Sequence, residues 1–127
     1  MKAVLLVFLG GGIGSVLRYY FNISFNFVFS GFPLGTFLAN IIGSLFIGII
    51  VGFLSKSQVM NDHLYLLLVI GFCGGFTTFS TFAIENQIYL KNGDYLSFFS
   101  YTFGTVLLSI LAVMLGLFLT KFYGLNN

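Results

Sequence analysis

Four long stretches of this 127-residue chain contain no charged side chain. They are Ala3–Leu17, Tyr19–Ser55, Leu64–Ile84 and Tyr95–Thr120. A helix of about 20 apolar residues is long enough to cross the hydrocarbon core of a bilayer. Only 6% of the residues are charged, whereas a soluble domain carries about 25%. The sequence therefore predicts an all-α membrane protein with four transmembrane helices.

Polar residues and charges set the expected ends of these spans. The second uncharged run is interrupted near its start by polar residues and by Pro33, the only proline, which suits the first turn of a helix. Cys73 is the only cysteine, so no disulfide can form within the chain. We expect one four-helix transmembrane domain over residues 1–127, with spans at about 3–21, 34–55, 64–90 and 97–121.

The positive charges are divided almost evenly between the two sides of the predicted bundle. Lys2, Lys56 and Lys121 fall on one side, and Arg18 and Lys91 fall on the other. Because an excess of positive charge orients a membrane protein, three against two gives only a feeble bias. The chain is therefore expected to insert in either direction, which would allow an antiparallel homodimer with a two-fold axis in the membrane plane.

Two spans carry small or polar residues at four-residue spacing. The stripe in the second span consists of Thr36, Asn40, Ser44, Gly48 and Gly52, and the last span carries Tyr101, Thr105 and Ser109. Residues at this spacing share one helical face, and small residues let membrane helices approach closely. Helix packing explains the glycines, but an amide in hydrocarbon is costly unless it is paired. Asn40 is therefore also a candidate binding or permeation residue.

The third span contains the segment GFCGGFTTFSTF (71–82), which is poorly suited to a continuous helix. Gly74-Gly75 is followed by Thr77-Thr78, and glycine and threonine are weak helix formers. Irregular backbone at membrane depth must be buried in protein or line a polar cavity, and freed carbonyls can then hold an ion. We expect a helix broken at mid-membrane; the alternative is a kink that only packs against a neighbouring helix.

The same segment places Phe76, Phe79 and Phe82 three residues apart, which predicts that they lie on or near one helical face. The positive edge of an aromatic ring can stabilise an anion without a fixed charge. Arg18 is the only cation within the predicted spans that an anion path could use, and it lies near the end of its span. Such a path would otherwise use ring edges, hydroxyls and the Asn40 amide. The residues indicate an ion path of either sign and show no constellation typical of an enzyme.

Three stretches resemble the Fluc (CrcB) family of fluoride channels, and the resemblance covers nearly the whole chain. They are GGGIGSVLRY (10–19), PLGTFLANIIGSLFIG (33–48) and GFCGGFTTFSTF (71–82). The chain departs from the family at Ser15, where Ala is usual, at Leu45, where Phe is common, and at Thr105, where Ser is frequent. The resemblance implies an antiparallel, dual-topology homodimer with two fluoride pores and a structural sodium ion at its centre. It implies passive fluoride exit that lowers cytoplasmic fluoride, through the bacterial plasma (inner) membrane.

The resemblance also assigns roles to particular residues. Backbone carbonyls of Gly74 and Thr77 would hold the sodium ion. Ring edges of Phe79 and Phe82 would face fluoride, and Asn40 would donate a hydrogen bond to it. The remaining pore residues carry hydroxyl groups and are Ser80, Thr81, Tyr101, Thr105 and Ser109. Two vestibule residues, Arg18 and Glu85, would lie near the pore mouths.

Two other functions fit a small four-helix membrane protein. A proton-coupled drug or cation exporter needs a carboxylate embedded in the membrane, and Glu85 is the only candidate in the predicted spans. A non-transporting subunit of a membrane assembly would need only the small-residue stripes. Loss of proton-coupled export in Glu85→Gln would favour the first alternative, and absence of any ion flux would favour the second.

Overall fold

A computed structural model describes residues 1–26, 31–55 and 62–123 of the chain. Within these residues, four helical spans are long and apolar enough to cross a membrane, which confirms the predicted all-α, four-span architecture. Their bounds are Lys2–Phe25, Leu34–Leu54, Asp62–Lys91 and Tyr95–Phe122. The parts of the predicted loops at 27–30 and 56–61 lie outside the described residues.

The first span is helix α1 (Lys2–Phe25), the second is α2 (Leu34–Leu54) and the fourth is α6 (Tyr95–Tyr123). The first and fourth spans are longer than predicted. At the start of α6, the Ser97 amide donates a hydrogen bond of 3.1 Å to the Asp94 carboxylate. A side-chain acceptor at this position stabilises the first turn, so the helix begins before residue 97.

The third span is built from several segments. It begins with α3 (Asp62–Leu64) and the π-helix η1 (Tyr65–Cys73), continues through α4 (Gly74–Phe76) and ends with α5 (Ser80–Lys91). Between α4 and α5, Thr77 has an extended backbone, with φ −78° and ψ 156°. The α-helical conformation is therefore interrupted from Thr77 to Phe79, within the segment that carries the glycine and threonine pairs.

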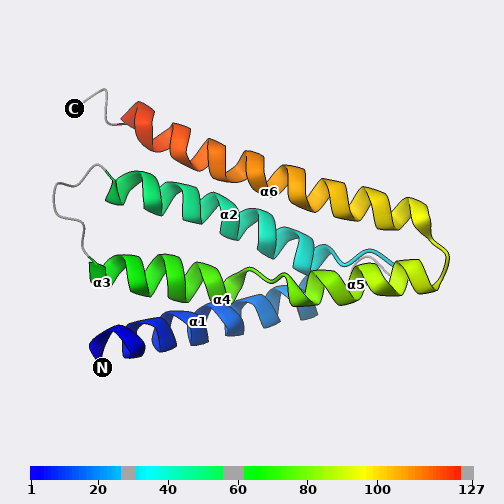
Figure 1. Cartoon of the computed structure of the whole chain (residues 1–127), viewed down its shortest axis with the longest axis horizontal. Coiled ribbons are helices and arrows are strands. Elements are labelled where there is room, and N and C mark those ends of the chain that lie inside the picture. The colour runs from blue at the N-terminus through cyan, green and yellow to red at the C-terminus, as the bar shows by residue number, and fades with distance from the viewer. Residues whose placement is uncertain (27–30, 56–61, 124–127) are drawn as a thin grey trace.

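The elements lie side by side along one long axis, and the start of α1 and the end of α6 lie at the same end of the bundle (Figure 1). Helix α1 packs against η1 and α4, and α2 packs against α6, to which it runs parallel (Figure 1). A Cβ atom at Gly48 would collide with the Val113 carbonyl, and one at Gly116 would lie 2.6 Å from the Leu45 carbonyl oxygen. Glycines on both helices thus allow direct contact between the backbones of α2 and α6.

A second close contact joins α1 to the third span. A Cβ atom at Gly14 would collide with the Phe72 carbonyl, and one at Gly75 would lie 2.9 Å from the Cα atom of Gly11. Because glycine has no Cβ, the helix backbones can touch at these positions. This contact fixes α1 beside the interruption in the third span.

The interruption separates phenylalanines that the sequence suggested would share a face. The ring of Phe76 is fully buried and packs edge-on against Phe21, with ring centroids 5.2 Å apart. Phe79 is 79% exposed, and its ring contacts Phe82 at 5.7 Å. The prediction of one shared face for all three residues is wrong, because extended Thr77 breaks the helical period between Phe76 and Phe79.

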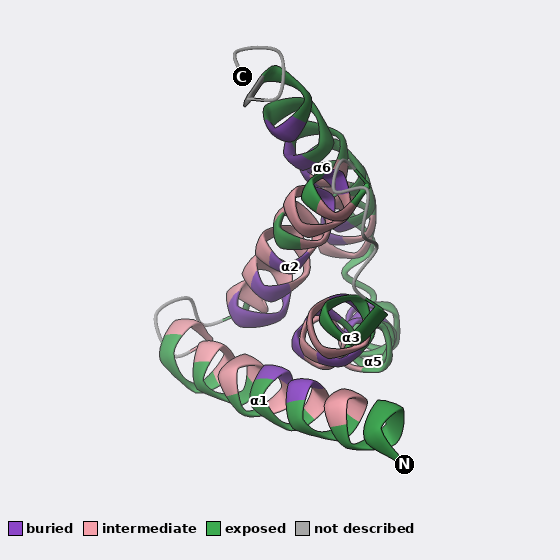
Figure 2. Cartoon of the chain, turned by 90° about the vertical axis from the view of Figure 1, so that its left-hand side faces the viewer, coloured by how far each residue is buried: buried purple, intermediate pink, exposed green. Residues whose placement is uncertain are grey.

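Large apolar side chains cover the outer surfaces of α1 and α6. Figure 2 shows the exposed residues along the side of α1 that faces away from the third span, and over much of α6. These residues include Val4, Phe8, Ile13, Leu107, Met114 and Phe118. Extensive exposed apolar surface of this kind suits contact with lipid or with another protein.

A polar groove at the helix interruption

A cavity of about 410 Å³ lies between α2, α6 and the interrupted part of the third span. Its lining residues are Asn40, Ser44, Ile47, Thr77, Thr78, Phe79, Phe82, Thr105, Val106, Ser109, Ile110 and Val113. We call this cavity the groove. It brings together five residues that the sequence assigned to the pore, namely Asn40, Phe79, Phe82, Thr105 and Ser109.

The groove is polar because the stripes of α2 and α6 meet in register. The two helices run parallel and touch at Gly48 and Val113. Ser44 and Ser109 each lie four residues before this contact, and Asn40 and Thr105 each lie eight residues before it. Both pairs line the groove. The spacing that suits close helix packing therefore also forms a polar track along one seam of the bundle.

Two hydroxyl groups in this track have no partner. The oxygen atoms Oγ1 of Thr105 and Oγ of Ser109 are buried and make no hydrogen bond in the described part of the chain. Thr105 is only 5% exposed. A buried polar group without a partner is costly, so native proteins usually satisfy it with a protein group, water or a ligand. The groove therefore has the chemistry of a binding site for a small polar species or ion.

Asn40 reaches across the groove and holds the backbone of the interruption. Its Oδ1 accepts a hydrogen bond from the Thr78 amide at 2.7 Å, and its Nδ2 donates to the Thr78 carbonyl at 3.1 Å. A neutral amide carries two N–H donors, so one of them remains for the groove. The expected pore donor is thus also a clamp on the non-helical backbone.

The clamp changes the pairing of the backbone around it. In a continuous helix the Thr78 amide would donate to the Gly74 carbonyl, and the Thr81 amide would donate to the Thr77 carbonyl. Here the Thr78 amide donates to Asn40, and the Thr81 amide donates to the Thr78 hydroxyl at 3.3 Å. The carbonyls of Gly74 and Thr77, to which the family resemblance gives a sodium-binding role, thereby lose their usual helical donors.

Arg18, which is expected near a pore mouth, contacts the third span just before the interruption. Its guanidinium Nε donates to the Gly75 carbonyl at 3.0 Å, and the Ser15 hydroxyl donates to the same oxygen at 3.4 Å. A cation near the last carbonyls of a helical segment offsets their partial negative charge. Arg18 and Ser15 therefore stabilise the end of α4 from the side of α1.

The predicted pore hydroxyls of Ser80 and Thr81 gather around Thr78. The Thr78 hydroxyl donates to Thr81 Oγ1 at 3.1 Å, and its oxygen lies 3.5 Å from the Ser80 hydroxyl. Ser80 is exposed and Thr81 is half-buried. The hydroxyl of Thr78 also accepts a hydrogen bond from the Thr81 amide in the first turn of α5, and Thr78 lines the groove.

Three aromatic rings form a chain at the edge of the groove. The ring centroids of Phe79 and Phe82 lie 5.7 Å apart, and those of Phe82 and Tyr101 lie 5.2 Å apart. Phe82 and Tyr101 are buried, whereas Phe79 is largely exposed. Tyr101 lies behind Phe82 and connects the groove to Glu85 through its hydroxyl.

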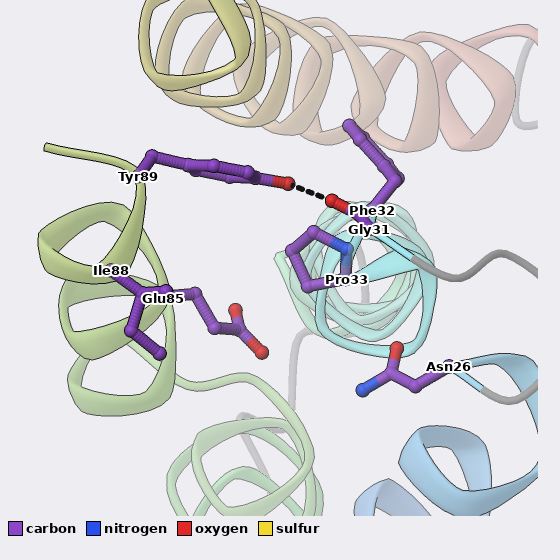
Figure 3. Close-up of a pocket in the computed structure, with 7 residues that line it drawn as sticks. All are labelled: Asn26, Gly31, Phe32, Pro33, Glu85, Ile88 and Tyr89. Atoms are coloured by element: carbon purple, nitrogen blue, oxygen red, sulfur yellow. Dashed lines mark hydrogen bonds between the residues drawn. The ribbon is translucent and has the colours of Figure 1, made fainter. Parts of the chain in front are cut away.

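Glu85 forms a second cluster of polar contacts, one helical turn beyond Phe82. Its carboxylate accepts hydrogen bonds from the Thr36 hydroxyl at 2.8 Å and from the Tyr101 hydroxyl at 2.7 Å. It also lines a separate cavity of about 240 Å³, in which the carboxylate points toward Pro33 and Asn26 (Figure 3). This cavity lies beside the start of α2.

Three residues of the site, Thr36, Ser44 and Thr78, have no site role predicted from the sequence. Thr36 binds Glu85, Ser44 lines the groove, and Thr78 is the residue that Asn40 holds. The four-residue stripe that contains Asn40 also contains Thr36 and Ser44, so that stripe was the available signal. The backbone role of Thr78 depends on a contact between distant segments, and no local pattern indicates it.

These features define a small four-span membrane protein whose polar groove lies beside an interrupted helix. Residues 5–117 match the family described as CrcB-like protein, Camphor Resistance (CrcB), and the chain belongs to this family. This confirms the resemblance seen in the sequence.

Named relatives match over almost their whole length. The chain is 51% identical over 122 residues to the fluoride-specific ion channel FluC of Phocaeicola vulgatus, covering 95% of this chain and 100% of the relative. It is 48% identical over 122 residues to the FluC of Gloeothece citriformis, covering 95% and 98%. It is 40% identical over 124 residues to the FluC of Azobacteroides pseudotrichonymphae, covering 97% and 99%.

Proposed function

We propose that this chain forms a fluoride-selective channel that lets fluoride leave the cytoplasm passively. The observation that carries the proposal is the groove, in which the hydroxyls of Thr105 and Ser109 are buried without partners beside Phe79 and Phe82. The relatives that are 40–51% identical carry the name fluoride-specific ion channel. A channel of this kind performs no covalent chemistry, so the protein is not an enzyme.

The chemistry of the groove suits a small anion. The residues that line it carry no charge, but Thr105 and Ser109 can each donate an O–H group. Phenyl rings can add their positive edges. Neutral donors can replace part of the hydration shell of fluoride without holding the ion as tightly as a fixed cation would. Fast conduction requires binding that is favourable for entry yet weak enough for release.

A second copy of the chain would complete each pore. Phe79 is 79% exposed, and two other lining residues, Val106 and Ile110, are 48% and 54% exposed. The wall that they form is therefore an outer surface of one subunit. We infer that an antiparallel partner covers this surface and encloses the groove, which the weak charge bias of the chain permits. Two grooves related by the two-fold axis would give two pores.

A structural sodium ion would sit where the interruptions of the two subunits meet at mid-membrane. The carbonyls of Gly74 and Thr77 fit this role because the amides of Thr78 and Thr81 donate elsewhere. Carbonyl oxygens are suitable ligands for hard cations. Gly74 is exposed on the subunit, so its backbone is accessible to a partner. The bound ion would join the two subunits and fix the interrupted backbone.

The proposed location is the bacterial plasma (inner) membrane, with four spans crossing it. Fluoride that accumulates in the cytoplasm must cross this membrane to leave the cell. Growth of a fluoride-sensitive bacterium without its own fluoride exporter tests this role. Expression of the chain is expected to restore growth at fluoride concentrations that stop the parent strain. Protein that is present in the membrane but gives no rescue would contradict the proposal.

The proton-coupled exporter remains the alternative that Glu85 could support, because the carboxylate lies in a membrane span and is half-buried. Both of its oxygens accept hydrogen bonds from neighbouring helices, which gives it a structural role as well. The two functions differ in their dependence on a proton gradient. Fluoride release without a proton gradient supports the channel, and proton-driven export of a cationic drug that is lost in Glu85→Gln supports the exporter.

A further inference from the structure

The α2 wall of the groove contains one hydroxyl that has no role in the pore proposed above. Ser44 lies on α2 and lines the same cavity as Ser109 on α6. We propose that the hydroxyls of Ser44 and Ser109 together form a second fluoride position, one helical turn beyond Asn40 and Thr105. This inference rests on the proposed channel function and adds a residue and a binding position to it.

Helix packing places the two serines at the same level. A Cβ atom at Gly48 would collide with the Val113 carbonyl, so the backbones of α2 and α6 touch one helical turn beyond the two serines. Ser44 and Ser109 each precede this contact by four residues on parallel helices, and residues at this spacing share a face. The groove therefore narrows toward the Gly48–Val113 contact, and the two serines form its last polar level.

The pairing of other hydroxyls shows that Ser109 is unusual. Ser55 and Ser100 donate to the carbonyl four residues earlier in their own helices, at 2.8 Å and 2.6 Å. This is the common way in which a helical serine satisfies its hydroxyl. Ser109 Oγ is buried and makes no such bond in the described residues, and neither does Thr105 Oγ1. Two unpaired hydroxyls on the α6 wall indicate that a ligand completes them.

The chemical requirement of this position is a small species that accepts several hydrogen bonds. Each serine hydroxyl has a single O–H donor, so the pair can offer one from each wall. An anion can accept both at once, whereas a cation would have to turn the hydroxyl oxygens toward itself. Because neither wall carries a formal charge, the position favours an anion that binds through strong hydrogen bonds, as fluoride does.

Threonine and valine at position 44 provide a matched pair, because they have nearly the same shape and only threonine keeps the hydroxyl. Fluoride release would be measured from liposomes that contain purified Ser44→Thr, Ser44→Val, Ser44→Ala or unchanged protein. Ser100→Ala is the control, since that exposed hydroxyl bonds to its own helix outside the groove. Size-exclusion chromatography of each variant verifies that it assembles as the unchanged protein does.

We expect Ser44→Val and Ser44→Ala to slow fluoride release roughly three- to tenfold, the effect of one lost hydrogen bond. Ser44→Thr and Ser100→Ala should stay close to the unchanged protein. Fluoride release by Ser44→Ala at the unchanged rate would overturn the second fluoride position. This holds even if the added methyl group slows release by Ser44→Thr and Ser44→Val equally. Absence of fluoride release from the unchanged protein would instead overturn the channel function.

Discussion

Asn40 and Thr78 are joined by a pair of hydrogen bonds that connects α2 to the interruption of the third span. The Thr78 amide donates to Asn40 Oδ1 at 2.7 Å, and Asn40 Nδ2 donates to the Thr78 carbonyl at 3.1 Å. One side chain thereby satisfies both backbone groups of a residue outside regular helix. Irregular backbone survives at membrane depth only with such partners.

Two replacements of Asn40 should distinguish its role in holding the Thr78 backbone from its role in the anion path. Asn40→Ala leaves both Thr78 backbone groups without this partner, which should cost roughly 1–3 kcal/mol of stability and lower the thermal midpoint of the detergent-solubilised protein. Asn40→Asp keeps the acceptor for the Thr78 amide but can place a negative charge beside the groove. We expect both variants to lose at least tenfold in fluoride flux. Full flux in an ionised Asp variant would exclude Asn40 from the path.

The phenylalanines of the groove should be required for flux but not for assembly. We expect Phe79→Ile and Phe82→Ile to reduce fluoride release roughly tenfold or more, because isoleucine has no positive ring edge to offer an anion. Phe103→Ile is the control, since this exposed ring on α6 stacks on Phe99. Undiminished release by the two groove variants, measured on intact dimers, would remove the ring-edge role.

Close packing of α1 against the third span makes Gly14 intolerant of a side chain. The Cβ atom of Gly14→Ala would collide with the Phe72 carbonyl and lie 2.8 Å from the Phe76 amide nitrogen. Overpacking of this kind costs roughly 1–3 kcal/mol, so the thermal midpoint should fall. Gly12→Ala is the matched control on the same helix, because in the described residues no atom of a neighbouring element lies within 4 Å of its Cβ position. Equal stability of the two variants would contradict the observed helix contact.

Sodium should stabilise the assembled protein. If the carbonyls of Gly74 and Thr77 hold the ion between two subunits, the thermal midpoint and the dimer fraction should rise with sodium concentration. A ligand that binds only the native state stabilises it by RT ln(1 + [L]/Kd). The measurement compares sodium with N-methylglucamine at equal ionic strength. Identical melting curves and dimer fractions in both salts would contradict a sodium site.

The sequence was sufficient to predict the four spans and the small-residue faces on which helices pack, although it did not pair α2 with α6. Charge-free runs define the spans because charged residues are costly in hydrocarbon. The stripe in the second span favours helix contact because small residues such as Gly48 leave room for a neighbouring backbone. These features depend on local spacing, which a single sequence contains.

Other features depend on contacts between distant segments and could not be read from spacing. The π-helical conformation of η1 occurs in a uniformly apolar stretch that has no distinctive pattern. The position of Phe76 away from Phe79 depends on the extended backbone of Thr77, and Asn40 holds the next residue, Thr78, from a distant helix. Likewise, the carboxylate of Glu85 gains its partners only when α2 and α6 pack beside α5.

The most direct test of fluoride conduction through the groove compares fluoride and chloride release from liposomes that contain the purified protein. Valinomycin and a potassium gradient supply the driving force, and electrodes record each anion. We predict rapid fluoride release with negligible chloride release, and strong slowing of fluoride release by Phe82→Ile. Absence of fluoride release from a folded dimer, or equal release of the two anions, would contradict a fluoride-selective pathway.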